Sequence, residues 1–139
     1  MSNFHATCLL VKQTGILLTG ASGSGKSDLA LRLIKEAGAV LVADDQVLLR
    51  VDDKRLIASC PTSIAGLLEV RGIGIVKQPY LPETEIQAVF ELVQDPGLVE
   101  RLPEPQQILI NGVSLPLIRL FPFELSAVHK IMLACDEIR

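Results

Sequence analysis

The sequence predicts an α/β domain with a mixed sheet, one helix after a glycine-rich loop, and antiparallel hairpins later in the chain. Three observations support this fold class. An apolar run at 15–19 precedes the loop, and the 3.6-residue pattern of a helix follows it at 26–37. A second fully apolar run, at 39–43, comes after the helix. Two hairpin patterns then follow, so an α/β core with an antiparallel extension is expected.

The helix over 26–37 has the clearest pattern. Leu29, Leu33 and Ile34 form its apolar face, and Gly38 is a natural C-cap. The other elements follow from alternation and from turn residues: the DDKR turn at 52–55 and an Asn-Gly pair each predict a hairpin. The expected elements are strands at 5–11, 15–19, 39–43 and 86–93, hairpins at 46–60 and 108–120, a glycine-rich loop with one short strand end or helical turn at 61–74, loops at 75–84 and 94–107, and a closing helix from about Phe123 to Ile138.

Composition limits the possible classes of protein. The chain has 139 residues, 49% of them hydrophobic and 4% aromatic, which predicts a single domain over 1–139 with an aliphatic core. The net charge of −3 argues against a nucleic-acid partner. No apolar run is long enough for a membrane span, and the N-terminus has no signal-peptide pattern, so a cytoplasmic protein is expected. The cysteines, Cys8, Cys60 and Cys135, are predicted to be reduced thiols.

The loop at 20–27 matches the P-loop pattern G-x-x-x-x-G-K-[ST] in full. It consists of Gly20, Ala21, Ser22, Gly23, Ser24, Gly25, Lys26 and Ser27. Glycines let backbone N–H groups turn towards a phosphate, and the helix N-terminus adds positive potential. In this pattern the lysine reaches the outer phosphates and the serine hydroxyl binds Mg²⁺. The sequence therefore predicts that Lys26 and Ser27 hold a magnesium nucleotide.

Asp44 and Asp45 follow the next apolar strand. Ligands of open α/β sheets bind at the carboxyl ends of strands, so these carboxylates are expected to face the loop. Adjacent side chains point in different directions, and the two can serve a metal or water and a substrate hydroxyl separately. The alternative is a polar strand end that starts a turn.

Glu69 and Arg71 are a charge pair inside an apolar, glycine-rich stretch. Such charges are costly to bury without partners, which favours a role in a site; the alternative is a surface ion pair. His5 on its own is a weaker candidate, because an isolated histidine in a first strand is commonly structural.

In this order and spacing, these motifs resemble the catalytic domain of HPr kinase/phosphorylase, the bacterial enzyme that phosphorylates a serine of the phosphocarrier HPr. His5 lies 15 residues before Gly20. The P-loop is followed by an acidic residue and a helix. The stretch LVADDQV resembles the strand end of the family, and LLEVRGIGIV resembles its Leu-Glu-Ile-Arg-Gly-Leu-Gly-Ile motif. The resemblance covers about residues 4–77.

The resemblance implies a kinase related in fold to phosphoenolpyruvate carboxykinase that uses ATP and Mg²⁺. Lys26 would grip the phosphates and Ser27 would bind magnesium. Asp45 would accept the proton of the serine hydroxyl, with Asp44 as its polar companion. A second set of roles follows from the same resemblance: Glu69 as a second metal ligand, His5 as an active-site histidine near the acceptor, and Arg71 as part of the motif tied to catalysis. It also implies HPr or an HPr-like nitrogen-regulatory carrier as partner, and a homo-oligomer, which is a hexamer in the family.

The sequence also departs from the family pattern. His5 lies almost at the start, so the N-terminal domain of the family is expected to be missing, as in the short single-domain versions of some proteobacteria. The basic loop that the family uses to remove phosphate would fall at 119–127, where Phe121-Pro122-Phe123-Glu124 stands instead of two arginines. The family also uses a further arginine between the LLEVRGIGIV motif and this loop, and the candidates for it are Arg101 and Arg119. Weak or absent phosphorylase activity is therefore predicted.

Other interpretations remain open at this point. A non-catalytic ATP sensor would need the P-loop but not a base at Asp45. A small-molecule kinase of another P-loop family would need an arginine-rich lid, for which the chain has little room after Arg71. Phe121 and Phe123 are either exposed contacts for the carrier or part of the core.

Overall fold

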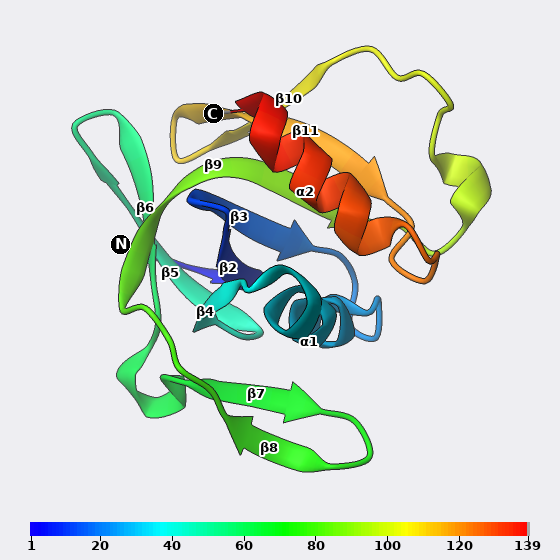
Figure 1. The fold of residues 1–139 in the computed structure, drawn as a ribbon. Coiled ribbons are helices and arrows are strands. Elements are labelled where there is room, and N and C mark those ends of the chain that lie inside the picture. Colours follow the sequence, from blue (N-terminus) through cyan, green and yellow to red (C-terminus); the bar gives the residue numbers. More distant parts are fainter. Residues whose placement is uncertain (139) are drawn as a thin grey trace.

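The computed structural model describes residues 1–138, and Figure 1 shows its fold. The strands are β1 (Ser2–His5), β2 (Thr7–Val11), β3 (Thr14–Thr19), β4 (Val40–Ala43), β5 (Gln46–Asp52), β6 (Arg55–Ser59), β7 (Leu67–Val70), β8 (Gly74–Lys77), β9 (Glu83–Leu92), β10 (Gln106–Ile110) and β11 (Val113–Leu120). The helices are α1 (Lys26–Ala37) and α2 (Ala127–Ile138), with short 3₁₀ turns η1 (Thr62–Ile64) and η2 (Pro96–Leu98). No helix within these residues is long and apolar enough to cross a membrane.

Within residues 1–138 nine strands form one mixed sheet, in which β9 has a central place. The main order is β1-β5-β6-β9-β3-β2-β4, and β11 pairs with β9 and with β10. β9 runs parallel to β3 and β11 but antiparallel to β6. The neighbours of β3 are thus β9 on one side and β2 on the other, so the strand that leads into the glycine-rich loop lies in the interior of the sheet.

Two apolar layers hold the sheet. On one face, residues from both helices pack against Ile16, Leu18 and Phe90. On the other face, Leu17 and Val89 pack with side chains from β5, β6 and β11. Neighbouring residues of β3 and β9 are thus buried on opposite faces, which explains why these strands are continuous apolar runs rather than alternating ones.

Several predicted elements are confirmed. The helix over 26–37 has the predicted bounds, and Gly38 caps it in the left-handed conformation, with φ 66° and its N–H bonded to the carbonyl of Leu33. The two predicted hairpins are β5–β6 and β10–β11. The α/β class with a mixed sheet is also confirmed.

Other predictions of local structure are wrong. The strand expected at 5–11 is two strands that break at Ala6, because β1 pairs with β5 whereas β2 pairs with β3 and β4. The segment 67–77, expected to be mainly loop, is the β7–β8 hairpin, whose glycines at 72 and 74 take positive φ angles of 87° and 123° at the turn. The closing helix begins at Ala127 rather than about Phe123, because Phe121–Ser126 forms a turn ahead of it.

Candidate functional site

The glycine-rich loop joins the end of β3 to the start of α1. Gly20, Gly23 and Gly25 have φ angles of 148°, 78° and 101°, a region that L side chains rarely adopt. A Cβ atom on Gly20 would lie 2.7 Å from the Ser24 hydroxyl oxygen, and one on Gly25 would lie 2.9 Å from the ring of Phe123. Both space and backbone conformation therefore require glycine at these two positions.

Lys26 is buried and bends back over the loop. Its Nζ donates to the carbonyls of Gly20 and Ala21 at 2.9 and 3.0 Å and lies 3.5 Å from the Ser24 hydroxyl. Burial lowers the pKa of Lys26 from its ordinary value, while the negative charges of Asp45 and Asp44 act in the opposite direction. The ammonium group thus lies at the centre of the loop, beside two carboxylates.

Asp44 is the hub of a buried hydrogen-bond network. Its Oδ1 accepts from the hydroxyls of Thr7 at 3.0 Å and Ser27 at 2.8 Å, and its Oδ2 accepts from the backbone N–H of Glu69 at 3.1 Å. Three separate segments, β2, α1 and β7, therefore meet at one carboxylate. These bonds hold the side chain of Asp44 inside the protein, facing Ser27.

The side chain of Asp45 points towards solvent, whereas that of Asp44 is buried, as expected for neighbouring residues at a strand end. Its φ of 73° is left-handed, its carboxylate lies 3.3 Å from Nδ1 of His5, and the two side chains are 61% and 48% exposed. A pair this exposed contributes little to stability. Its consequence is orientation: the imidazole and the carboxylate are presented together to solvent.

A hollow of about 610 Å³ connects the loop with the β7–β8 hairpin. Lys26, Ser27, Asp45, Glu69 and Arg71 all line it. The structure therefore brings together the predicted residues of the loop, the second aspartate and the charge pair. His5 reaches this group through Asp45, and Asp44 reaches it through its hydrogen bond to Ser27.

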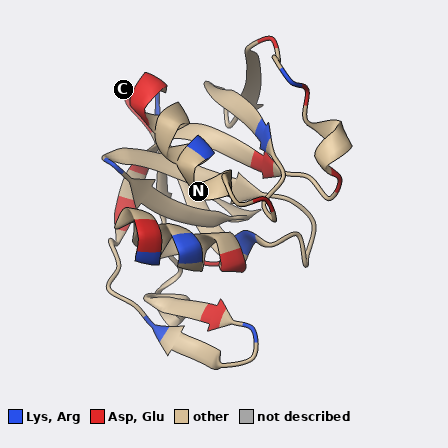
Figure 2. Cartoon of the chain, turned by 45° about the vertical axis from the view of Figure 1, so that its right-hand side comes forward, with Lys and Arg blue, Asp and Glu red and all other residues tan. Residues whose placement is uncertain are grey.

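Side chains of both charges line this hollow, with Asp28, Asp45 and Glu69 as the acidic ones. Figure 2 shows charges of both signs following one another along α1, so the helix has no uniformly positive face. The cationic groups that line the hollow are Lys26 and Arg71. The N-terminus of α1, which no side chain of residues 1–138 caps, adds positive potential to them.

The side chain of Phe123 forms one wall of the hollow. It is 55% exposed and packs edge-on against Phe121, with 5.8 Å between ring centroids. The carbonyl of the intervening Pro122 accepts a hydrogen bond from Arg32 of α1. Phe123 is therefore exposed rather than part of the core, while its contact with a carrier stays a prediction. The turn that carries it is bonded to the helix after the P-loop.

Sequence reasoning missed Thr7 and the position of Phe123. Thr7 is fully buried and bonded to Asp44, but a single threonine in an apolar strand carries no pattern that would reveal a partner 37 residues away. Among residues 1–138, no three His, Cys, Asp or Glu side chains cluster as a metal site. Two oxygen donors next to the loop are joined by a hydrogen bond of 2.8 Å, the Ser27 hydroxyl and the Asp44 carboxylate.

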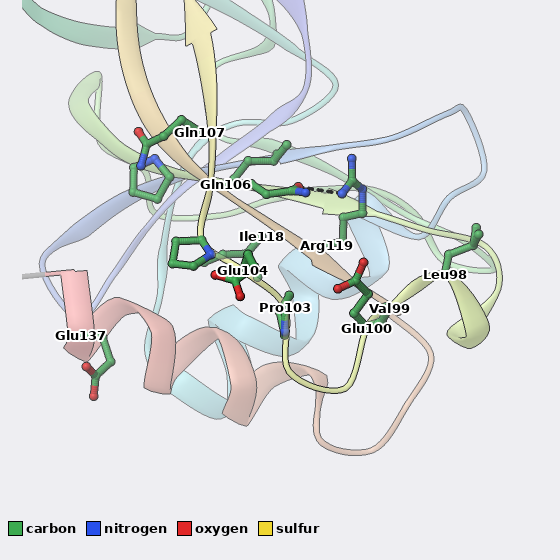
Figure 3. Close-up of a pocket in the computed structure, with 13 residues that line it drawn as sticks. Leu98, Val99, Glu100, Pro103, Glu104, Gln106, Gln107, Ile118, Arg119 and Glu137 are labelled. Atoms are coloured by element: carbon green, nitrogen blue, oxygen red, sulfur yellow. Dashed lines mark hydrogen bonds between the residues drawn. The ribbon is translucent and has the colours of Figure 1, made fainter.

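A second hollow of about 560 Å³ lies between β10, β11, the connection at 98–105 and the end of α2 (Figure 3). Arg119 lines it and is bonded to Glu91 at 2.8 Å and to Gln106 at 2.7 Å. Arg101 lies in the exposed connection nearby. Arg119 therefore belongs to a different surface from the P-loop hollow, and its guanidinium already has partners.

A strand, glycine loop and helix with acidic residues at the next strand end form the arrangement that α/β domains use to bind phosphate groups. The chain belongs to the family described as "HPr Serine kinase C-terminal domain", whose model matches residues 1–119. The resemblance drawn from the motifs is thereby confirmed.

Relatives and a solved structure support this membership. The chain is 44% identical over 110 residues to an HPr kinase/phosphorylase of Clostridium botulinum (73% of this chain, 36% of the relative). It is 38% identical over 129 residues to that of Chlorobaculum tepidum (84% and 37%). It thus spans little more than a third of these relatives. It also resembles the Hpr(Ser) kinase/phosphatase structure from Coxiella burnetii, with a TM-score of 0.86, 28% identity, and coverage of 99% of this chain and 97% of that one.

Proposed function

We propose that this domain transfers the γ-phosphoryl group of ATP to a serine hydroxyl of HPr or of an HPr-like carrier. The observation that carries the proposal is the hollow itself. Lys26 and Ser27 of the phosphate loop line the same cavity as the carboxylate-bearing Asp45. Phosphoryl transfer needs positioning, charge neutralisation and a proton acceptor rather than covalent catalysis. The printed names of the relatives, HPr kinase/phosphorylase and Hpr(Ser) kinase/phosphatase, agree with this activity.

Each residue has a distinct part in the proposed reaction. Lys26 and the loop N–H groups hold the phosphates. Asp45 accepts the proton of the serine hydroxyl while that oxygen bonds to the γ-phosphorus, and the bond from the γ-phosphorus to the β–γ bridging oxygen breaks to release ADP. His5, 3.3 Å from Asp45, orients this carboxylate next to the acceptor. Arg71 lines the hollow, where its charge can stabilise the transferred group.

Ser27 and Asp44 are the residues that would hold Mg²⁺. They offer a hydroxyl and a carboxylate with oxygens 2.8 Å apart, which suits a hard cation that keeps several waters and phosphate oxygens as its other ligands. Bound there, the ion neutralises charge on the phosphates. Glu69 lines the hollow and is the candidate second ligand.

We also propose that the phosphorylase activity, in which inorganic phosphate attacks the phosphoserine and leaves as pyrophosphate, is weak. The turn at Phe121–Glu124 presents the apolar ring of Phe123 to the hollow instead of a basic group. Neither an attacking inorganic phosphate nor a phosphoserine gains charge pairing from such a wall. Comparable rates of phosphate-dependent dephosphorylation and of phosphorylation would contradict this second proposal.

The kinase proposal is tested with purified protein, labelled ATP, Mg²⁺ and candidate carriers, followed by mapping of the modified residue. Replacing Asp45 with asparagine should reduce transfer by about 100-fold or more while ATP still binds, because the general base is lost but the phosphate loop is intact. Lys26→Ala should lose both ATP binding and transfer.

Asp53→Asn is the matched control for Asp45→Asn. Asp53 is also an exposed aspartate with positive φ (51°), but it lies in the β5–β6 turn. The control should transfer phosphate at the wild-type rate. Full transfer by Asp45→Asn would show that the assigned base is wrong, and an ATP-binding wild type that labels no carrier would favour the sensor instead.

A further inference from the structure

The hydroxyl of Thr7 touches both aspartates of the site. It lies 3.0 Å from Oδ1 of Asp44, and the backbone N–H of Asp45 points to it at 3.4 Å. A carboxylate only accepts hydrogen bonds, so the hydroxyl proton goes to Asp44, and an oxygen lone pair accepts from Asp45. The Thr7 hydroxyl therefore bonds to the carboxylate of Asp44 and to the peptide of Asp45 at once.

The peptide of Asp45 needs such support. A φ of 73° is unfavourable for a residue with a Cβ, and it persists only where surrounding bonds fix it. The carbonyl of Asp45 accepts from the N–H of Ala6 at 3.1 Å, and the N–H of Gln46 bonds to the carbonyl of Asp44 at 2.9 Å. The Thr7 hydroxyl accepts from the N–H of Asp45, so Ala6 and the first residue of β2 together hold both polar backbone groups of the strained residue.

The fold itself does not require a hydroxyl at such a position. Thr14, which pairs with Val11 across the same two strands, is also fully buried, and within residues 1–138 its hydroxyl has no hydrogen-bond partner. A buried threonine here is thus tolerated without a bond. The 3.0 Å bond from Thr7 to Asp44 and the longer one of 3.4 Å from Asp45 to Thr7 are therefore specific to the aspartates rather than a general requirement of the strand.

We infer that Thr7 is a positioning residue for phosphoryl transfer, which locks the metal-side carboxylate of Asp44 and the base-bearing backbone of Asp45 into one arrangement. This inference rests on the proposed kinase function. Thr7 does not line the hollow, so it acts only through the two aspartates. The Thr7 hydroxyl thus fixes the position of Asp45, the proposed base, relative to Ser27, which bonds to Asp44.

The decisive comparison is between Thr7→Val, Thr7→Ser and Thr14→Val. Valine keeps the shape of threonine and removes only the hydroxyl, whereas serine keeps the hydroxyl. A hydrogen bond to a charged group corresponds to about a tenfold to hundredfold effect. We expect kcat of Thr7→Val to fall by about that factor. The KM for ATP should change by less than about threefold, because Lys26 and the loop are untouched.

The other two variants provide rescue and control. Thr7→Ser should recover kcat to within about threefold of the wild type. Thr14→Val should keep kcat within about twofold of the wild type and should not lower Tm, because within residues 1–138 the Thr14 hydroxyl makes no bond that valine would lose. The inference is overturned if Thr7→Val keeps the wild-type kcat, if serine gives no rescue, or if Thr14→Val loses as much activity as Thr7→Val.

Hydrogen exchange separates this inference from the proposed function. The amide of Asp45 should exchange about tenfold or more faster in Thr7→Val, while the amides of β3 stay protected. If the wild-type protein transfers no phosphate to any carrier, the kinase proposal fails, and the positioning role is then decided by this exchange alone. Unchanged protection of the Asp45 amide would overturn it.

Discussion

Replacing Gly15 with alanine should destabilise the sheet strongly although the backbone conformation there suits any residue. Gly15 lies in β3 at a register shift opposite β9. A Cβ atom at this position would lie 2.0 Å from the backbone carbonyl oxygen of Glu85 and 3.1 Å from Cγ2 of Thr84. Glycine is required at this bulge because another backbone approaches closely.

The magnitude follows from that distance. Real Cβ contacts are essentially never under 3.0 Å, so β3 and β9 would have to separate by at least about 1 Å. Overpacking of a core commonly costs about 1–3 kcal/mol, and here the obstacle is backbone in the middle of the sheet. We therefore expect a loss of about 3 kcal/mol or more in the free energy of unfolding, and a decrease of about 10 °C in Tm.

Gly97→Ala is the matched control. Gly97 likewise has no positive φ, and its nearest obstacle is a side-chain oxygen of Asp95 at 3.3 Å on the exposed η2 turn. This oxygen also accepts from the N–H of Gly97 at 2.9 Å, but it ends an exposed side chain and need shift only slightly, so the control should unfold within about 2 °C of the wild type. Thermal and denaturant unfolding of both variants measures the difference. Equal Tm values for Gly15→Ala and Gly97→Ala would refute the steric argument.

Two further predictions concern the loop and the thiols. Gly25→Ala should weaken ATP binding by about tenfold or more, because φ 101° is strained and the new Cβ meets Phe123. Gly38→Ala, where φ is also positive but the space is open, should lose only stability. Equal ATP affinities of the two variants by calorimetry would contradict this. Alkylation under native conditions should modify half-buried Cys60 before fully buried Cys8, whose pKa burial raises strongly. Burial also raises the pKa of Cys60 above its ordinary 9.0, so the alkylation rate of Cys60, followed by mass spectrometry, should still increase above pH 9. A rate that reaches a plateau below pH 9 would contradict this.

How far the sequence could lead depended on the range of each interaction. The loop at 20–27 and the helix after it are local patterns, and both were predictable from spacing alone. The pairing of His5 with Asp45 could be expected only from family resemblance, because it depends on β1 lying beside β5. The roles assigned to these residues stay predictions.

Long-range contacts were out of reach. Thr7 meets Asp44 across 37 residues, and nothing in an apolar strand indicates which hydroxyl will be bonded and which, like that of Thr14, will not. The β7–β8 hairpin was missed because its glycines resemble those of an irregular loop. They serve instead as the tight turn that brings Glu69 and Arg71 to the hollow.

The central place of β9 affects the order in which the protein can acquire its ligand site during synthesis. β3 leads directly into the glycine loop, yet its parallel neighbour is made about 70 residues later, and only then is β3 enclosed on both sides. Parallel pairing at such a sequence separation is slow to form. A ribosome-bound chain that stops before β9 has emerged would therefore carry the complete loop sequence without a rigid strand to hold it. Binding of the proposed nucleotide should begin only once β9 has joined both halves of the chain.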